Sequence, residues 1–543
     1  MKTAKTICCL LVLTLAAVSL QARQLDHPVI RKQALEAFRN GNWKDAYQLY
    51  RKLCLEITND PKIVGQDLLQ AWQCLRNLNR LSELDGFRKA VIAKHFNNWR
   101  LLQAAAKSFQ QNNHWGYLVA GEFHRGGHRG GGKYVNSIRR DRIRAMQLMN
   151  RALRLTAEDP QKKEVAALHL DFGSIINPYN PDGQAWRLQY LTDWRSLPDY
   201  DAGHGYEYGR VQGAPVDAEG MPVFHKMPDS FESAKSDGQR WRWLLEKSAM
   251  LNPDLETHVQ YTLASFLQQQ FGVQTLSSDN RYFARGLSKS DSDPSSQALS
   301  RYEVHTLKDS ETLAKLATGV KRFSLPEEFN HIELFRQIVK SPDKGYAGQA
   351  ARALAQIYEN RRLYHQAVAY WKIYQRFNKS EGQRHIDQIV KNQGVFEAVG
   401  TQPSGRLPTV EYRFRNGSQV HLKAYRIRIK PLIEDVKAYI RSNPWRLDRQ
   451  QLRVNNIGQR LVGKNQTQYV GQKVADWDLE LNPDKRHWDR RVTIKLPKTL
   501  TRAGAYLLVA EMQNGNTARI IIWVSDTTII KKPLDNKVLY YLA

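Results

Sequence analysis

The period of the hydrophobic residues changes near residue 396, and this change constrains the fold more than any other feature of the sequence. From about residue 28 to residue 395, apolar residues recur at spacings of three and four, which is typical of amphipathic helices. From about Phe396 onward they alternate with polar residues, as in Val410, Tyr412 and Phe414, which predicts half-buried strands. The sequence therefore predicts an α+β protein of several domains, a helical region followed by an antiparallel β-domain.

Two segments of the helical region carry the small and aromatic residues of paired helices. In the first segment, Asn40-Gly41-Asn42 separates two runs with helical spacing, and Ala46 lies where the two helices would approach closely. The second copy comprises Ala353, Ile357, Tyr358, Tyr364, Ala367, Trp371 and Tyr374. This spacing resembles a tetratricopeptide helix pair. We expect residues 23–395 to form an irregular α-solenoid with a concave binding face, and a generic helical bundle is the alternative.

A loop-rich insertion interrupts the helical pattern between about residues 177 and 238. An insertion of this length is usually an ordered binding loop or a mobile flap. The insertion contains acidic residues and histidines that could form a calcium or catalytic cluster, namely Asp199, Asp201, His204, Asp217 and His225. Solvated carboxylates in a loop are the commoner case. Because their spacing identifies no pair of nucleophile and base, we predict no catalytic residue, and a hydrolase is the least favoured class.

The glycine-rich segment from Gly126 to Lys133 could cradle a phosphate, as a nucleotide-binding loop does. Such a loop needs a preceding strand and a Gly-Lys-Ser/Thr ending, but Lys133 is followed by Tyr134. We therefore predict a basic connector between helices. His124 and His128 have a spacing that would suit a metal on a helix, but the glycines favour a loop. No metal and no cofactor is predicted.

The run Arg240-Trp241-Arg242-Trp243 interleaves aromatic and basic residues, which could stack on bases or sugars. A helix that starts near Ser236 and turns Trp241 inward explains the same pattern. Nucleic-acid binding is also disfavoured by the export signal described next.

The first residues have the pattern of a secretory signal. A basic start precedes the apolar run from Ile7 to Leu20, and we expect cleavage after Ala22. No later segment approaches the roughly 18 uninterrupted apolar residues of a membrane span. The sequence therefore predicts an exported protein of the periplasm or the extracellular space, without a stable membrane span.

Two cysteines, Cys54 and Cys74, lie beyond this signal, while Cys8 and Cys9 lie within it. An oxidising compartment would permit one disulfide between Cys54 and Cys74. The alternative is that both are small buried residues on helical faces. Neither interpretation indicates a cysteine enzyme.

The chain is strongly basic, with a net charge of +28. Residues 396–543 hold 26 basic and 13 acidic side chains, so the predicted β-domain is the most cationic part. This balance favours acidic partners such as a polyanionic polysaccharide, an anionic lipid or a nucleic acid, without choosing among them.

The β-domain ends in three strand-like runs. Gly504 to Ala510 and Ile520 to Asp526 flank the turn residues Asn514-Gly515-Asn516, which predicts a hairpin. The last run, Lys537 to Ala543, is expected to be an edge strand or the cut end of a longer polypeptide, because a strand needs a partner for its backbone groups.

These motifs resemble the early macroglobulin domains of bacterial alpha-2-macroglobulin proteins. In that family a G-x-Y strand, as at Gly504-Ala505-Tyr506, and a W-V-S-D strand, as at Trp523 to Asp526, close one domain before the next begins. The segment from Phe414 to Arg426 is similar to a hairpin of the family. The segments 214–217 and 236–241 resemble the long N-terminal extension of some members. The resemblance implies a macroglobulin-like β-sandwich after the helical region.

The resemblance also implies a function. Family members trap proteases when an exposed bait segment is cleaved, and many capture them through a thioester in a Cys-Gly-Glu-Gln-type motif. Cys54 and Cys74 lack these neighbours, and no bait segment is recognisable. The leading expectation is therefore the non-catalytic N-terminal portion of an endopeptidase inhibitor, whose contact with proteases depends on a missing C-terminal portion. The alternative is a stand-alone exported scaffold that binds another envelope protein or an acidic glycan.

Overall fold

The structure, a computed structural model, describes residues 26–177, 188–203, 216–217, 221–272, 304–316, 319–443, 445–446, 448 and 467–543. The predicted signal and its cleavage site at Ala22 lie outside the described residues. The chain divides into two compact units, Met1–Leu263 and Ala264–Ala543. The sequence did not predict this division, since the change of period near residue 396 lies inside the second unit.

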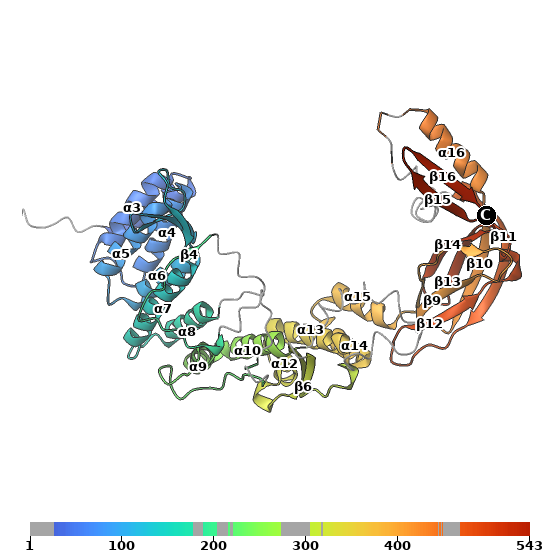
Figure 1. The fold of residues 1–543 in the computed structure, drawn as a ribbon. Coiled ribbons are helices and arrows are strands. Elements are labelled where there is room, and N and C mark those ends of the chain that lie inside the picture. The colour runs from blue at the N-terminus through green and yellow to red at the C-terminus, as the bar shows by residue number, and fades with distance from the viewer. Residues whose placement is uncertain are drawn as a thin grey trace, which may run out of the picture. The chain divides into compact units, whose positions relative to one another are not determined.

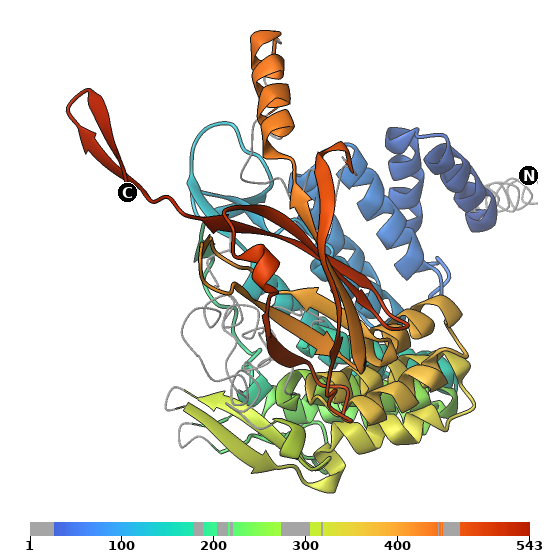
Figure 2. The same cartoon turned by 90° about the vertical axis from the view of Figure 1, so that its right-hand side faces the viewer.

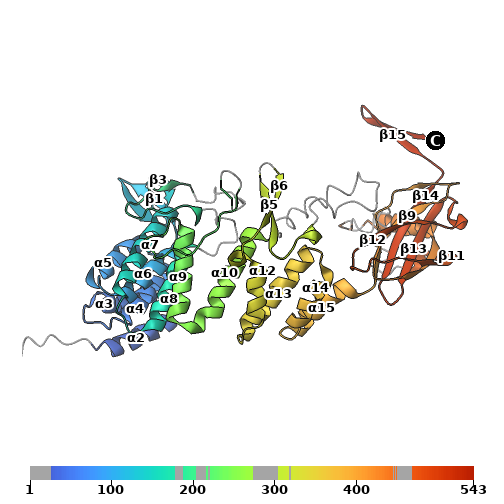
Figure 3. The ribbon, with the colours of Figure 1, turned by 90° about the horizontal axis from the view of Figure 1, so that it is seen from below.

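Helices dominate the first unit, and Figure 3 shows α3 to α9 side by side with β1 and β3 beside one end of them. The helices are α2 (His27–Arg39), α3 (Trp43–Leu55), α4 (Val64–Asn77), η1 (Leu81–Glu83), α5 (Leu84–Lys94), α6 (Trp99–Gln110), α7 (Ile138–Leu155), α8 (Lys162–Ile176), α9 (Asp237–Leu251) and η3 (Pro253–Leu255). Here η marks a short 3₁₀ helix.

The predicted helix pair at the N-terminal end is present as α2 and α3. The side chain of Asp26 caps α2 by accepting a hydrogen bond from the Val29 amide. Gly41, at a φ of +76°, allows the chain to turn between the two helices. Ala46 is fully buried, as expected for a residue at a close helix contact.

A small antiparallel sheet interrupts the helices, which the sequence did not predict. Its strands are β1 (Trp115–Val119), β2 (Glu122–Arg125), β3 (Lys133–Asn136) and β4 (Asp201–Ala202), in the order β2-β1-β3-β4. The glycine-rich segment therefore joins two strands, so its prediction as a connector between helices was wrong. Strands of four or five residues carry little hydrophobic periodicity, which is why the helical pattern around them concealed the sheet.

Helix α9 begins where the sequence predicted a helix to resume. Ser236 caps it by accepting a hydrogen bond from the Gln239 amide, 3.2 Å away. Trp241, Leu244 and Leu245 are all buried, so the inward orientation predicted for this helix is confirmed.

Helix α10 (Glu256–Phe271) crosses the boundary between the two units. It is followed in the second unit by η5 (Val304–Thr306), η6 (Glu327–Phe329), α12 (His331–Val339), α13 (Lys344–Asn360), α14 (Tyr364–Tyr374) and α15 (Lys379–Val390). The hairpin β5 (Glu311–Leu316) and β6 (Gly319–Ser324) lies between η5 and η6 in the chain. Helices α13 and α14 match the second predicted helix pair, and Figure 1 shows them side by side. Ala367 and Trp371 are fully buried.

Two sheets follow these helices in the same unit. The five-stranded sheet has the order β11 (Val470–Glu480), β10 (Gln419–Ile427), β13 (Gly504–Met512), β14 (Thr517–Ser525) and β8 (Gln402–Pro403). The three-stranded sheet has the order β12 (Arg490–Lys495), β9 (Thr409–Arg415) and β7 (Gln393–Phe396), and the short helices η9 (Thr467–Tyr469) and η10 (Lys498–Leu500) flank the strands. Buried residues of both sheets form one hydrophobic cluster, which includes Tyr412, Leu422 and Leu508. Among the described pairings of these named strands, that of β8 with β14 is parallel and the others are antiparallel.

The turn at Asn416-Gly417 joins strands of different sheets, because β9 pairs with β7 and β12 while β10 pairs with β11 and β13. The hairpin expected there was therefore wrong. Asn416, at a φ of +63°, donates from its side-chain amide to the carbonyl oxygens of Ile389 and Lys391 and accepts from His487 Nδ1. The turn thus holds the end of α15 as well as the sheets.

Two further elements complete the β-rich part. Helix α16 (Ile429–Arg441) covers part of the outer face of the five-stranded sheet, where Leu432 joins Leu507 in a second hydrophobic cluster, and Figure 2 shows its far end extending away from the strands. The last strand-like run is β16 (Lys537–Leu542), and β15 (Ile529–Leu534) is its antiparallel partner. Every residue of this hairpin is exposed.

Candidate functional site

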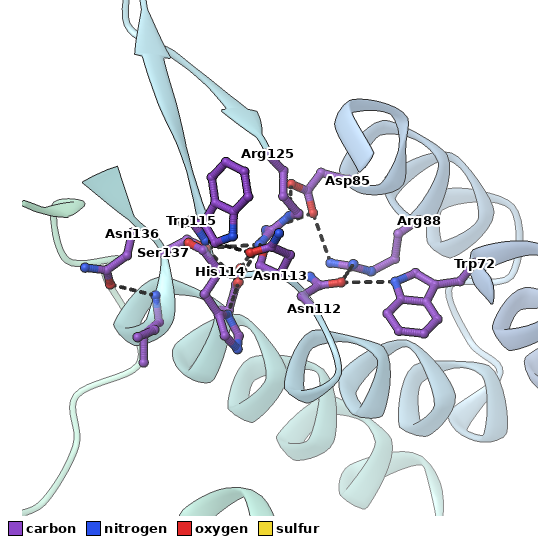
Figure 4. Close-up of polar contacts among 12 residues, drawn as sticks. Trp72, Asp85, Arg88, Asn112, Asn113, His114, Trp115, Arg125, Asn136 and Ser137 are labelled. Atoms are coloured by element: carbon purple, nitrogen blue, oxygen red, sulfur yellow. Dashed lines mark hydrogen bonds and ion pairs between the residues drawn. The ribbon is translucent and has the colours of Figure 1, made fainter. Parts of the chain in front are cut away.

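A buried ion-pair network connects the small sheet of the first unit to its helices (Figure 4). Arg125, at the end of β2, points both terminal nitrogens at Asp141 on α7, with distances of 2.9 and 3.0 Å to the two carboxylate oxygens. Its Nε donates to Asp85 on α5 over 3.0 Å. Arg125 and Asp141 are almost fully buried, so each needs the other to offset the loss of hydration.

The network continues through a second buried arginine. Arg88 contacts Asp85 at 3.2 Å and also donates to the side-chain oxygen of Asn112, which accepts a further bond from Trp72 Nε1. Burial lowers the pKa of the Arg88 guanidinium to about 10, although Asp85 opposes that shift. Arg88 therefore keeps its charge at neutral pH.

His114 and Ser137 also contact Asp141, which gathers a serine, a histidine and an aspartate at one place. His114 Nδ1 and Ser137 Oγ lie 2.8 and 2.7 Å from the same oxygen of Asp141. Burial by itself raises the pKa of the Asp141 carboxyl, but hydrogen bonds from His114 and the charge of Arg125 bring it below its ordinary value. Ser137 Oγ also lies 3.0 Å from the His114 carbonyl oxygen and bonds no imidazole nitrogen, which is not the arrangement of a nucleophilic triad. The group positions the sheet.

The outer face of this sheet carries five rings in one continuous row, which we call the aromatic face. Tyr117 on β1 is in register with His124 on β2 and with Tyr134 on β3, so the three side chains share one side of the sheet. Ring centroids along the row are 6.2 Å apart for Trp115 and Tyr134, 5.4 Å for Tyr134 and Tyr117, 6.4 Å for Tyr117 and His128, and 4.8 Å for His128 and His124. All five side chains are partly exposed.

The glycine-rich loop places His128 on this face. Gly126 has a φ of +85°, and a Cβ there would lie 2.9 Å from the Leu81 side chain. Gly132 has a φ of +111°, and a Cβ there would lie 2.8 Å from the Leu118 carbonyl oxygen. Glycine therefore serves the close packing of this loop against the strands and η1, and Arg129 is exposed within it.

Of the residues that the sequence singled out, His124, His128 and the glycine-rich segment lie at the aromatic face. Cys54 on α3 and Cys74 on α4 are buried and free. Asp201 pairs with Arg139, and His225 contacts the helix at Gly238, where an added Cβ would lie 2.2 Å from its ring. His204 lies outside the described residues. Among the described residues, no group of three or more histidines, cysteines, aspartates or glutamates could hold a metal ion.

Sequence reasoning missed the buried ion-pair network because its parts come from distant segments. Arg125 and Asp85 are forty positions apart, and no spacing rule pairs them. The alternation of Trp115 and Tyr117 across Gly116 was a usable signal for a strand. It extends over only five residues, within a region of helical periodicity.

Comparisons with known proteins give a limited result. No family model matches the sequence, and no curated protein matches it. A solved structure of native alpha-2-macroglobulin from Escherichia coli, spanning the domains MG0, NIE and MG1, is 16% identical, covers 28% of this chain and 45% of that chain, and has a TM-score of 0.20. Another, spanning NIE and MG1, is 17% identical, covers 28% and 69%, and has a TM-score of 0.18.

The chain thus spans less than half the length of the first of these structures. TM-scores of this size do not establish a shared fold. Along the described parts of the chain, no helix is both long and apolar enough to cross a membrane.

Proposed function

We propose that the chain is the non-catalytic N-terminal portion of an exported, alpha-2-macroglobulin-like endopeptidase inhibitor. In this proposal the helical region is a tetratricopeptide-like solenoid that positions the trap, and the two sheets form a macroglobulin-like sandwich. The bait and thioester regions would lie in a further portion of the protein. Proteases would be bound through that portion.

The observation that carries the proposal is the pairing of the two family-like motifs. Tyr506 of the G-x-Y motif lies opposite Ile522, and Gly504 lies opposite Val524 of the W-V-S-D motif, in one antiparallel ladder. Strand β13 is the central strand of the five-stranded sheet. Tyr506 is 1% exposed, and its hydroxyl donates to the Arg502 carbonyl oxygen over 2.8 Å. Both motifs thus contribute to the core of one domain, which supports a structural role for them.

The two cysteines support the absence of a thioester from these residues. Burial raises the pKa of the Cys54 thiol well above its ordinary value and that of Cys74 to about 11. A thioester of this kind joins a cysteine to a glutamine within a Cys-Gly-Glu-Gln-type motif. Neither Cys54 nor Cys74 has those neighbours in the sequence.

The experiment is to determine the coding sequence that follows the codon for Ala543 and to express the chain with any in-frame continuation. The proposal expects further β-domains with a bait segment. The extended protein should block endopeptidase cleavage of a large protein substrate while a small peptide substrate is still cleaved, because an enclosed protease remains accessible to small molecules. The shorter chain should block neither.

A stop codon with no adjacent reading frame of this kind would overturn the proposal. The chain would then be a stand-alone exported scaffold. An extended protein that inhibits large and small substrates equally would also contradict trapping, because that result indicates a block of the protease active site.

A further inference from the structure

We propose that the aromatic face of the small sheet binds an acidic polysaccharide. This inference goes beyond the proposed inhibitor architecture and does not depend on it. It rests on three properties of the face: a continuous row of partly exposed rings, a rigid support beneath them, and a basic loop at their edge.

The row of rings is continuous but not flat, because Tyr117 and Tyr134 meet edge to face at 70° and the other neighbouring rings are tilted by 30 to 43°, so the row offers several separate ring faces. The centroids of neighbouring rings are 4.8 to 6.4 Å apart, so the space between two successive rings is too narrow for another side chain. The five members are aromatic or imidazole rings, which present flat faces and polar edges. The flat side of a pyranose carries C–H groups and its rim carries hydroxyls, and this combination matches flat rings with Oη and ring-nitrogen edges.

The support beneath the rings reduces the cost of binding. The opposite side of the sheet carries Arg125 and Val135, both buried, and Arg125 is bound to Asp141 and Asp85 on two helices. A face held in place by such contacts loses little conformational freedom when a ligand binds. The strands cannot shift relative to the helices without exposing or separating the buried charges.

The charge around the rings selects an acidic polymer. Segment 114–136 contains one acidic residue, Glu122, and three basic ones, Arg125, Arg129 and Lys133. Arg129 and Lys133 are exposed, and the described structure assigns them no ion-pair partner. His124 and His128 contribute no hydrogen bond to the described structure, so their ring nitrogens can meet hydroxyl or carboxylate groups of a ligand. Uncompensated positive charge at this edge favours a carboxylated or sulfated sugar over a neutral one.

Other polymers fit the face less well. A peptide that added a strand to the sheet would need a long free strand edge, but the edge strand β2 has four residues. Single-stranded nucleic acid also stacks on aromatic rings. It is disfavoured by the predicted export of the protein and serves as a competing probe.

The test is affinity electrophoresis of the full chain in native gels containing polygalacturonate, with dextran as the neutral comparison. We expect retardation by polygalacturonate and none by dextran. Tyr117→Leu should weaken the retardation about tenfold in apparent dissociation constant, since it removes the central ring, and Tyr117→Phe should retain it. Tyr540→Ala, which removes an exposed ring from the β15–β16 hairpin, is the matched control and should leave binding unchanged.

The contribution of charge is tested with a second matched pair. Arg129→Gln should weaken binding several-fold, whereas Arg39→Gln, which removes an exposed arginine at the end of α2, should not. Equal effects of the two variants would show that binding follows net charge and would overturn the proposal. Unchanged binding by Tyr117→Leu would also overturn it, as would stronger retardation by single-stranded DNA than by polygalacturonate. If Tyr117→Leu unfolds, the comparison of Arg129→Gln with Arg39→Gln still decides the outcome.

Discussion

Arg125 and Asp141 form a two-point ion pair that is almost completely buried between strand β2 and helix α7. Removal of Arg125 leaves the buried Asp141 carboxylate with hydrogen bonds from His114 and Ser137 but without its ion-pair partner, and breaking a buried pair in this way typically costs about 3–5 kcal/mol. We expect Arg125→Met to lower the free energy of unfolding of the first unit by that amount, measured by urea denaturation. Arg195→Met, which breaks an exposed pair with Asp193, should change it within error. A loss as small as that control would contradict the assigned role of Arg125.

Acid stability should depend on a buried histidine of the second unit. Burial, together with the Arg361 charge, lowers the pKa of His331 to about 3, and neither ring nitrogen has a hydrogen-bond partner in the described structure. An unfolded chain would protonate this group near its ordinary pKa of about 6.5. Between these pH values the unfolded state binds the extra proton, so stability falls as the pH falls, by up to about 1.4 kcal/mol per pH unit.

His331→Leu should remove this contribution, so its free energy of unfolding should change less between pH 6.5 and pH 4 than that of the unaltered protein. The measurement is a denaturant titration of both proteins at several pH values. Parallel pH profiles would show that His331 does not carry the effect.

The turn at Asn416 allows backbone and side-chain effects to be separated. In the variant Asn416→Gly, the new glycine can adopt the same φ of +63°. The side-chain hydrogen bonds to the carbonyl oxygens of Ile389 and Lys391 are lost. We expect this change to cost about 1 kcal/mol, because the carbonyl oxygens of Ile389 and Lys391 lose a side-chain donor and the second of these bonds is exposed to solvent. Asn416→Ala should cost about 1 kcal/mol more, since alanine is strained at positive φ. Equal losses in thermal or urea unfolding would show that the backbone conformation is not limiting.

The thiols of Cys54 and Cys74 offer a direct chemical measurement. Both side chains are buried, and their pKa values are raised, so they should react slowly with a thiol reagent in the native protein at pH 8. In denaturant and without a reductant, a chain that begins after Ala22 should release two thiols, and Cys74→Ala should release one. If no thiol reacts until a reductant is added, the two residues are joined by a disulfide.

Local patterns in the sequence were sufficient for several helices and one hairpin. Helices α2 and α3, the pair α13 and α14, and helix α9 after Ser236 follow from apolar spacing together with turn or capping residues, which act within a few positions of each other. The hairpin of β13 and β14 follows in the same way from two apolar runs around Asn514-Gly515. The solenoid and sandwich arrangements remain proposals.

The sequence by itself thus determined the α+β fold class, the order of the helical and β-rich regions and the strongly basic character of the protein. The tertiary structure decided where the turn at Asn416 leads, which strands share a sheet, and that Arg125, Asp85 and Asp141 meet beneath the aromatic face. The physical reason is range. Periodicity and capping depend on neighbouring residues, whereas sheet pairing and charge burial depend on contacts between segments tens of residues apart, whose energies no local pattern records.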